Sequence, residues 1–303
     1  MPNKTSYLPI QDLAPMNLIQ YNESLQLVSN FSKPLILPKK WSTKNDLEFS
    51  AKYWEDYMGG AIPCSYSEKN TIHFGKRKAY YCEVAGINPN GTLIGLLFGN
   101  SFSMNIITAV ASNQLFKKVI NLFISGSEFP AHDDFEEYLM EKMIKPIKPD
   151  VIFIVQKYVE THLYETPIDK IQEHEKFKHW TNILKVIENY TSAIVINKEQ
   201  IKFPYDISTD FIRKKIYDLP VESRIKNPPP SPNLEAWLAA LKCSKCEFFG
   251  YREAFCDGEF CNVLDLATGL PLYRDASHIS LLGIRRIKPF IDKAIYKALK
   301  MCV

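Results

Sequence analysis

The chain has 303 residues, of which 46% are hydrophobic, 13% aromatic and 23% charged. Such a composition excludes a largely disordered chain, and the length suffices for one large domain or two small ones. The formal net charge of +3 is too small to predict a nucleic-acid or anionic-membrane partner. No apolar run reaches the roughly 18 residues that a membrane helix needs, and the first residues lack a signal-peptide pattern.

The chain begins with a segment, residues 1–60, that shows little periodicity and that we interpret as an extracytoplasmic lead-in. A short amphipathic helix is expected within residues 41–57. The apolar run 92–98 predicts a strand buried on both faces, and helical periodicity follows from Ser101 to Val119. A buried strand leading directly into a helix is typical of an α/β fold.

Two further apolar runs, 151–155 and 193–196, predict buried strands later in the chain. Asn233 is expected to cap a helix after a proline-rich break, and Pro289 is expected to start or kink the last helix. Short apolar strands that alternate with helices predict an α/β fold with a mostly parallel sheet.

The seven cysteines allow two interpretations. Cys243 and Cys246 have the spacing of zinc ligands, whereas Cys256 and Cys261 are more widely separated. Disulfides would instead require an oxidising compartment. Five N-x-S/T sequons favour that compartment, namely Asn3, Asn22, Asn30, Asn90 and Asn189. We therefore expect a glycosylated extracytoplasmic (extracellular or lumenal) part of a longer membrane protein, with no metal site.

A polar turn, Gly99–Asn100–Ser101, follows the first of these apolar strands. A serine at this point lies at the carboxyl end of a parallel strand, where α/β sheets bind ligands and where helix-start N–H groups can stabilise an oxyanion. The other interpretation is that Ser101 only caps the following helix. These residues alone leave both open.

A second pattern, Asp275–Ala276–Ser277–His278, comes shortly before the last helix. A carboxylate three residues before a histidine can reach the imidazole Nδ1–H and leave Nε2 free to accept a proton. Asp-x-x-His by itself is only weak evidence for a catalytic histidine. It becomes informative here because it precedes the last helix and follows a candidate nucleophilic serine turn earlier in the chain.

These two patterns resemble the first and last sequence blocks of the SGNH (GDSL-like) hydrolase superfamily. More closely, the stretches that contain them, together with the strand PDVIFIVQKY, resemble the C-terminal SGNH domain of animal acyltransferase-3-type membrane proteins. Members of that family carry Gly-Asn-Ser and have cysteines ahead of Asp-x-x-His. The resemblance covers roughly residues 60–300. It implies a three-layer α/β/α flavodoxin-like domain over residues 61–303.

The resemblance also implies roles for individual residues. Ser101 would be the nucleophile, His278 the general base and then acid, and Asp275 the residue that orients His278. Oxyanion donors would be the Ser101 N–H and Gly126, which follows a helix or strand over residues 119–124. The family often has Asn in its third block; here Gln156 would substitute for it, with Tyr158 as the other choice.

For the cysteines, the resemblance implies disulfides that brace the first strand and the loop carrying Asp275 and His278. Cys64 would pair with Cys82, and the remaining bonds would form within the set Cys243, Cys246, Cys256 and Cys261. Cys302 would be the unpaired thiol.

The function that follows is a serine esterase or O-acyltransferase without a cofactor. Its partners would be an acyl donor, a glycan or lipid hydroxyl as acceptor, and an acyltransferase-3 membrane domain. A catalytically weak SGNH-shaped binding module is the alternative, because the third-block Asn is absent. An α/β-hydrolase is disfavoured, because Ser103 stands where the G-x-S-x-G elbow needs Gly.

Other chemistry-bearing side chains have simpler interpretations. The cluster at His132 is expected to be a solvated helix start, and three other histidines, His162, His174 and His179, are expected on the surface. The tryptophans are expected to be packing anchors; they are Trp41, Trp54, Trp180 and Trp237.

Overall fold

The computed structural model describes residues 18–33, 42, 44, 48, 71–74, 77–130 and 133–301. In chain order its elements are α1 Leu18–Ser32, β1 Thr71–Phe74, β2 Arg77–Ala85, β3 Leu93–Gly99, α3 Ser101–Ala111, β4 Phe116–Ile124, α4 Asp133–Tyr138, the π-helix η4 Leu139–Ile144, α5 Lys145–Ile147, β5 Val151–Val155, α6 His162–Glu165, the 3₁₀-helix η5 Ile168–Glu173, α7 Glu175–Ile187, β6 Ala193–Asn197, α8 Ile207–Ile216, β7 Arg224–Lys226, α9 Pro232–Ala240, β8 Cys246–Phe249, α10 Arg252–Phe255, β9 Cys256–Asp257, β10 Phe260–Asn262 and α11 Leu281–Ala298.

Within these residues the larger sheet has the strand order β1-β2-β4-β3-β5-β6-β8. The pairs β4–β3, β3–β5, β5–β6 and β6–β8 are parallel, whereas β2 and β1 extend the β4 edge in antiparallel fashion. Numbered along the chain, the five parallel strands have the doubly wound order 2-1-3-4-5 of flavodoxin-like sheets. The predicted α/β class with a mostly parallel sheet is therefore confirmed.

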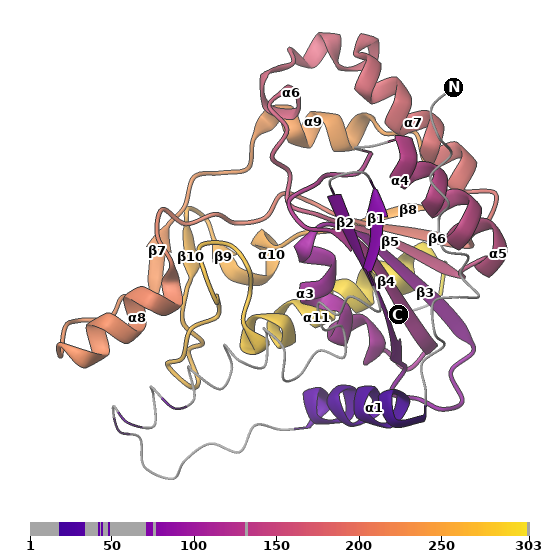
Figure 1. Ribbon diagram of the computed structural model, residues 1–303. Coiled ribbons are helices and arrows are strands. Elements are labelled where there is room, and N and C mark those ends of the chain that lie inside the picture. The colour runs from indigo at the N-terminus through magenta and orange to yellow at the C-terminus, as the bar shows by residue number, and fades with distance from the viewer. Residues whose placement is uncertain are drawn as a thin grey trace.

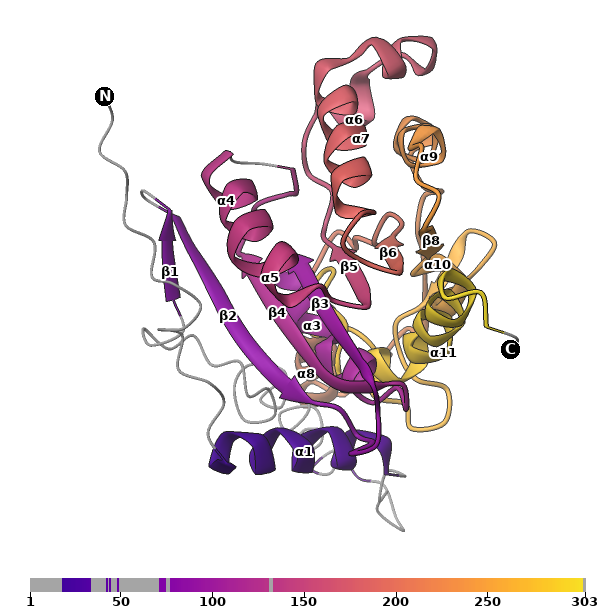
Figure 2. The same ribbon diagram turned by 90° about the vertical axis from the view of Figure 1, so that its right-hand side faces the viewer.

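Helices cover both faces of this sheet, as Figure 2 shows with α4 and α7 on one side and α3 and α11 on the other. Successive side chains of a strand point to opposite faces. Leu97 and Phe153 accordingly pack in the core beneath α3 and α11, while Leu96 and Ile152 pack in the core beneath α4 and α7. Burial on both faces explains why these strands are continuous apolar runs in the sequence.

The predicted strands 92–98, 151–155 and 193–196 correspond to β3, β5 and β6. The helix expected to run to Val119 is wrong in its second half, because α3 ends at Ala111 and Val119 lies in β4. β4 lies between β2 and β3, and this position buries its apolar residues whatever their spacing along the chain.

Two expectations about helix ends are also corrected. Ser231, not Asn233, caps α9, and its Oγ accepts the N–H of Leu234. Asn233 instead donates through Nδ2 to the carbonyl oxygens of Tyr164 and Thr166. Pro289 lies inside α11, so of the two expected alternatives the one in which it starts the helix is wrong.

The part of the chain before residue 60 contributes to the core. Helix α1 lies below the lower end of the sheet in Figure 1, in contact with β2 and α3, and its Val28 and Phe31 are buried in the core cluster that includes α3 and α11. The domain division near residue 60 stays a prediction, and most of the helix expected within 41–57 lies outside the described residues. None of the described helices has both the length and the hydropathy of a membrane-crossing segment.

A second, three-stranded antiparallel sheet has the order β7-β10-β9. It lies with α8 to one side of the main sheet (Figure 1). The chain leaves β10 toward the Asp275–His278 loop, and Leu272 of that segment donates its N–H to the carbonyl oxygen of Val263, 2.8 Å away. The small sheet thereby supports the segment that carries Asp275 and His278.

Gly99 ends β3 at a point where the backbone approaches β5 very closely. Its φ is +141°, and a Cβ atom there would lie 2.1 Å from the Val155 carbonyl oxygen. Only glycine tolerates this combination, because a side chain would meet both the backbone strain and the clash.

We expect Gly99→Ala to lower the free energy of unfolding by about 3 kcal/mol or more, because strain and clash add. Gly126→Ala is the matched control. Its φ of +71° is also positive, but no atom lies within 4 Å of the added Cβ, so we expect a loss of about 1 kcal/mol. Urea unfolding of both variants measures the difference, and equal losses would contradict this account of Gly99.

Candidate active site

Ser101 is the first residue of α3 and directly follows the turn at the end of β3. Asn100 is the N-cap, and its Oδ1 accepts the N–H of Phe102. The Ser101 hydroxyl is therefore not the helix cap, and its Oγ instead lies 2.9 Å from Nε2 of His278. The position is the carboxyl edge of the sheet between β3 and β5, where the chain's winding reverses and α/β sheets bind ligands.

Asp275 contacts the other nitrogen of the same imidazole. Its Oδ2 lies 2.7 Å from His278 Nδ1, and its Oδ1 accepts the backbone N–H groups of Ser277 and His278. Burial alone would raise the pKa of Asp275, but the hydrogen bonds and the charge of His278 outweigh it and lower the pKa to about 2. The serine, histidine and aspartate predicted from the sequence are thus brought together. This arrangement can move a proton from the serine hydroxyl to the imidazole.

The imidazole of His278 is also held from its face and from its backbone. Its ring stacks on Phe102, with 4.3 Å between the ring centroids. One residue later, Asn105 of α3 accepts the N–H of Ile279 and donates to the Ile279 carbonyl oxygen. The helix that begins with Ser101 therefore also fixes the segment that carries His278.

Gly126 lies in the turn after β4, the strand that pairs with β3 on the side away from β5. Its carboxyl-edge position is compatible with a backbone donor near Ser101. The oxyanion role of Gly126 stays a prediction.

The side chains of the two third-block candidates, Gln156 and Tyr158, are bonded elsewhere and are not placed to act as oxyanion donors. Gln156 is fully buried, and its amide bonds reciprocally to the backbone N–H and carbonyl oxygen of Phe129, at 2.6 and 2.9 Å. The Tyr158 hydroxyl is buried and donates to the carbonyl oxygen of Asn197 at 2.7 Å. Both side chains hold neighbouring loops together, so the expected role of Gln156 as an oxyanion donor loses its support.

Lys157, between them, is the residue that sequence reasoning missed. Its backbone N–H donates to Asn100 Oδ1 and its carbonyl oxygen accepts from Asn100 Nδ2, both at 3.0 Å. Its Nζ donates to the hydroxyl of Ser277, also at 3.0 Å. The sequence did contain a signal for Lys157. Residues 156–158 directly follow a buried parallel strand, and side chains of successive residues in an extended segment point to opposite sides, so Lys157 is expected to point away from its two neighbours.

Described cysteines form disulfides rather than a metal site. Cys243 bonds to Cys246 before β8, and Cys256 bonds to Cys261 between the paired strands β9 and β10. Cys82 is also disulfide-bonded, and its predicted partner, Cys64, lies outside the described residues, as does Cys302. In the part of the chain that the structure describes, no cluster of metal-ligating side chains occurs.

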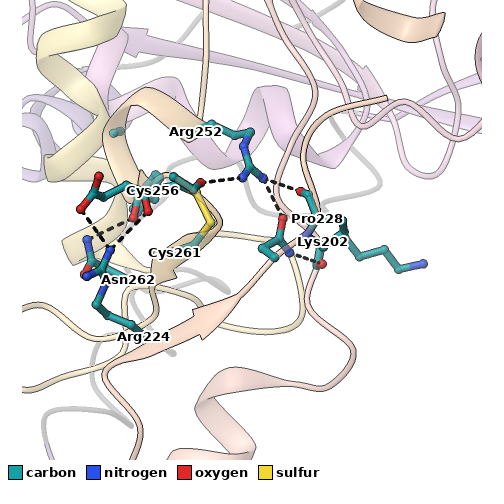
Figure 3. The surroundings of a disulfide bond; sticks show 12 residues. Lys202, Arg224, Pro228, Arg252, Cys256, Cys261 and Asn262 are labelled. Atoms are coloured by element: carbon teal, nitrogen blue, oxygen red, sulfur yellow. Dashed lines mark hydrogen bonds and ion pairs between the residues drawn. A yellow bond between two sulfur atoms is a disulfide. The ribbon is translucent and has the colours of Figure 1, made fainter. Parts of the chain in front are cut away.

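The surroundings of the Cys256–Cys261 disulfide tie the small sheet to the loop before α9 (Figure 3). Arg252 donates to the side-chain oxygen of Asn227 and to the carbonyl oxygen of Pro228. Asn227 in turn donates to the carbonyl oxygen of Lys202. Cys256–Cys261 joins two strands that precede the Asp275–His278 segment, whereas Cys243–Cys246 closes the turn into β8. That these disulfides brace the Asp275–His278 segment stays a prediction.

The histidines outside the site are more varied than expected. His179 is half-exposed and contacts Glu136, whereas His162 and His174 stack on each other and pack against Trp237. Trp180 and Trp237 are buried, as predicted. His132, Trp41 and Trp54 lie outside the described residues. The described sequon asparagines are exposed; they are Asn22, Asn30, Asn90 and Asn189.

Comparisons with known proteins identify the family of the chain. A family model described as "SGNH domain (fused to AT3 domains)" matches residues 63–293. No curated protein matches the sequence significantly. Among solved structures, the periplasmic domain of a lipopolysaccharide acetyltransferase from Salmonella ser. Paratyphi A is 10% identical, covering 68% of this chain and 84% of that one, with a TM-score of 0.45. A catalytic mutant of an acetylxylan esterase from Geobacillus stearothermophilus is 14% identical, covering 70% and 96%, with a TM-score of 0.36. These likenesses are distant, and neither protein's substrate transfers to this chain.

The lowered pKa of Asp275 predicts a pH-dependent contribution to stability. Because the pKa falls from 3.8 to about 2 on folding, ionised Asp275 stabilises the folded state above about pH 4, and this contribution disappears as the pH falls toward 2. We expect Asp275→Asn to lose about 2 kcal/mol of unfolding free energy at pH 7. Urea unfolding between pH 7 and pH 3 measures the difference from wild type. A difference that stays constant over this range would contradict the prediction.

Proposed function

We propose that this chain, which belongs to the family of SGNH domains fused to AT3 domains, is a serine-dependent O-acyl esterase or O-acyltransferase. One observation carries the proposal: the Ser101 hydroxyl contacts His278 Nε2 at 2.9 Å while Asp275 contacts Nδ1 of the same ring at 2.7 Å. Nucleophile, base and orienting carboxylate in this order support acyl chemistry on the serine oxygen.

In the proposed reaction, Ser101 Oγ attacks the carbonyl carbon of an ester and its proton passes to His278 Nε2. The tetrahedral intermediate collapses when His278 returns this proton to the leaving alcohol, and the acyl group stays on Ser101. A second hydroxyl then attacks the acyl-serine, again with His278 as base. Asp275, ionised at neutral pH by its low pKa, stabilises the imidazolium at each step.

The oxyanion of each intermediate needs hydrogen-bond donors close to Ser101. The backbone N–H of Ser101 begins α3, so the partial positive charge of the helix start would act on it. Gly126, from the turn after β4, would supply a second backbone donor.

Water or an alcohol can serve as the second nucleophile, so the same residues support hydrolysis and transfer. Family membership favours transfer, because members of this family are fused to AT3 domains. We propose that such a membrane domain is the source or the recipient of the acyl group. The disulfides and the exposed sequon asparagines favour an extracytoplasmic location for the site.

A catalytically weak binding module is the second candidate. The observation in its favour is the third block, where Gln156 and Tyr158 are committed to neighbouring backbone and the usual Asn is absent. Loss of one oxyanion donor lowers rates by about 100-fold or more.

Ser101→Ala tests the proposal directly. We expect the wild-type domain to hydrolyse a short-chain nitrophenyl ester and the variant to lose roughly 10⁴-fold or more in kcat/KM, because no other hydroxyl replaces the nucleophile. A fluorophosphonate probe should label Ser101, with the labelled peptide identified by mass spectrometry.

Ser192→Ala is the matched control, because Ser192 is an exposed serine that precedes β6 outside the site. It should retain both hydrolysis and labelling. A wild-type domain that neither hydrolyses the ester nor reacts with the probe would favour the binding module.

A further inference from the structure

The Lys157 ammonium lies against the residues that flank His278. Its Nζ donates to the Ser277 hydroxyl at 3.0 Å, and Ser277 directly precedes His278. Nζ also lies 6.0 Å from the centre of the Phe102 ring, which itself stacks on His278. A positive charge is therefore held within the immediate surroundings of the serine–histidine pair.

The backbone of Lys157 is fixed in this place. Asn100 is buried and bonds to both the N–H and the carbonyl oxygen of Lys157. Because Asn100 directly precedes Ser101, a single side chain sets the spacing between the nucleophile and the lysine. The backbone of Lys157 is thus fixed beside Ser101, and the bond from Nζ to the Ser277 hydroxyl places its ammonium next to His278.

No carboxylate within the described residues forms an ion pair with Lys157. The carboxylate of the site, Asp275, has both oxygens occupied, one by the His278 ring and the other by the N–H groups of Ser277 and His278. The contacts of Lys157 Nζ are a neutral hydroxyl and an aromatic face. Neither neutralises a full positive charge.

This arrangement costs free energy in the absence of a ligand. Burial lowers the pKa of Lys157, and repulsion from Lys202 lowers it further, while Asp275 opposes both effects. A half-buried charge that has no ion-pair partner is unfavourable, and an anion bound beside it recovers part of that cost.

Lys202 is a second positive charge, close enough to Lys157 for the two to repel each other. Its neighbour Phe203 donates its N–H to the carbonyl oxygen of Ala276 at 2.8 Å, which sets this segment beside the Asp275–His278 loop. Asn227 holds the carbonyl oxygen of Lys202, and Figure 3 shows the lysine side chain extending away from that contact. Lys202 is exposed, so its amine is accessible to a ligand.

We propose that Lys157, assisted by Lys202, binds an anionic substituent of the substrate, a carboxylate or a phosphate close to the hydroxyl that carries or receives the acyl group. This inference rests on the proposed function and narrows it to acidic substrates. A neutral acylated sugar would fit the serine and histidine but would leave the ammonium of Lys157 without a counter-ion.

The alternative role for Lys157 is an oxyanion donor that replaces the missing third-block Asn. The two roles have different kinetic consequences. An oxyanion donor acts on every ester, so its loss lowers kcat for neutral and anionic substrates alike. An anion subsite acts only on substrates that carry the charge, so its loss changes the ratio between them.

The experiment compares three acetylated sugars: an acetylated methyl glucuronoside, an acetylated glucose 6-phosphate and an acetylated methyl glucoside. We expect wild-type kcat/KM to be roughly tenfold or more higher for at least one of the two anionic esters than for the neutral one, and to approach the neutral value at 1 M salt. The two anionic compounds distinguish a carboxylate from a phosphate. Equal kcat/KM for all three would overturn the anion subsite while leaving the esterase proposal intact.

Variants assign the preference to Lys157. In Lys157→Gln the ratio of kcat/KM for anionic esters to kcat/KM for the neutral ester should fall at least fivefold. Lys157→Arg keeps the charge, so its ratio should be higher than that of Lys157→Gln. Lys202→Gln should cause a smaller fall. The control is Lys178→Gln. Lys178 is an exposed lysine of α7, so this substitution removes the same charge outside the site and should leave the ratio of kcat/KM for anionic and neutral esters unchanged. Equal losses on all three esters in Lys157→Gln would overturn the proposal in favour of the oxyanion role.

Binding separates this inference from the catalytic proposal. Calorimetry on Ser101→Ala should show tighter binding of methyl glucuronoside or of glucose 6-phosphate than of methyl glucoside, and the difference should disappear when Lys157→Gln is added. If wild type hydrolyses no ester but this preference is present, the proposed activity fails and the anion subsite stands. Equal affinities for charged and neutral sugars would overturn the subsite, whatever the activity.

Discussion

Four buried amide side chains hold the loops of the site to one another: Asn100, Asn105, Gln156 and Asn197. Each both donates to and accepts from the backbone of another segment. Asn197 at the end of β6 bonds to the backbone of Gln156, and the Gln156 side chain bonds to Phe129. Asn100 and Asn105, both from the β3–α3 segment, bond to Lys157 and Ile279 in the same way. Because strand ends at a buried edge leave backbone groups without sheet partners, these bonds satisfy the groups and set the loop positions together.

This constraint explains how the nucleophile and its base meet although they lie far apart in the sequence. Ser101 and His278 are 177 residues apart, and Asn105 joins their two segments from within the helix that Ser101 begins. Phe102 completes the arrangement by stacking on the imidazole. Helix α3 therefore positions the serine, the histidine loop and one face of the histidine ring. The sheet contributes the site's location, between the carboxyl ends of β3 and β5.

The third block shows how a departure from a family pattern acquires meaning only in three dimensions. Three consecutive residues, Gln156, Lys157 and Tyr158, all carry side chains that can donate hydrogen bonds. Two of them are directed to neighbouring backbone, and Lys157 alone of the three directs its side chain to the Ser277 hydroxyl beside His278. Where the resemblance implies an Asn, this chain therefore has three other donors, and only Lys157 brings a positive charge beside His278. That charge is the feature that would make this site selective among esters.

The sequence by itself determined the buried strands and the mostly parallel sheet, because apolar runs are local signals. It singled out Ser101, Asp275 and His278 only through their resemblance to a family pattern, since each short motif alone has a simpler interpretation. It could not place β4, whose spacing of apolar residues suits a helix as well as a strand until the neighbouring strands bury it. Nor could it separate Gln156 from Lys157, since which side chain turns toward the site depends on where Phe129 and Ser277 lie. These partners are distant in sequence, so only the tertiary structure decided which third-block residue contacts the site and which one holds its loops in place.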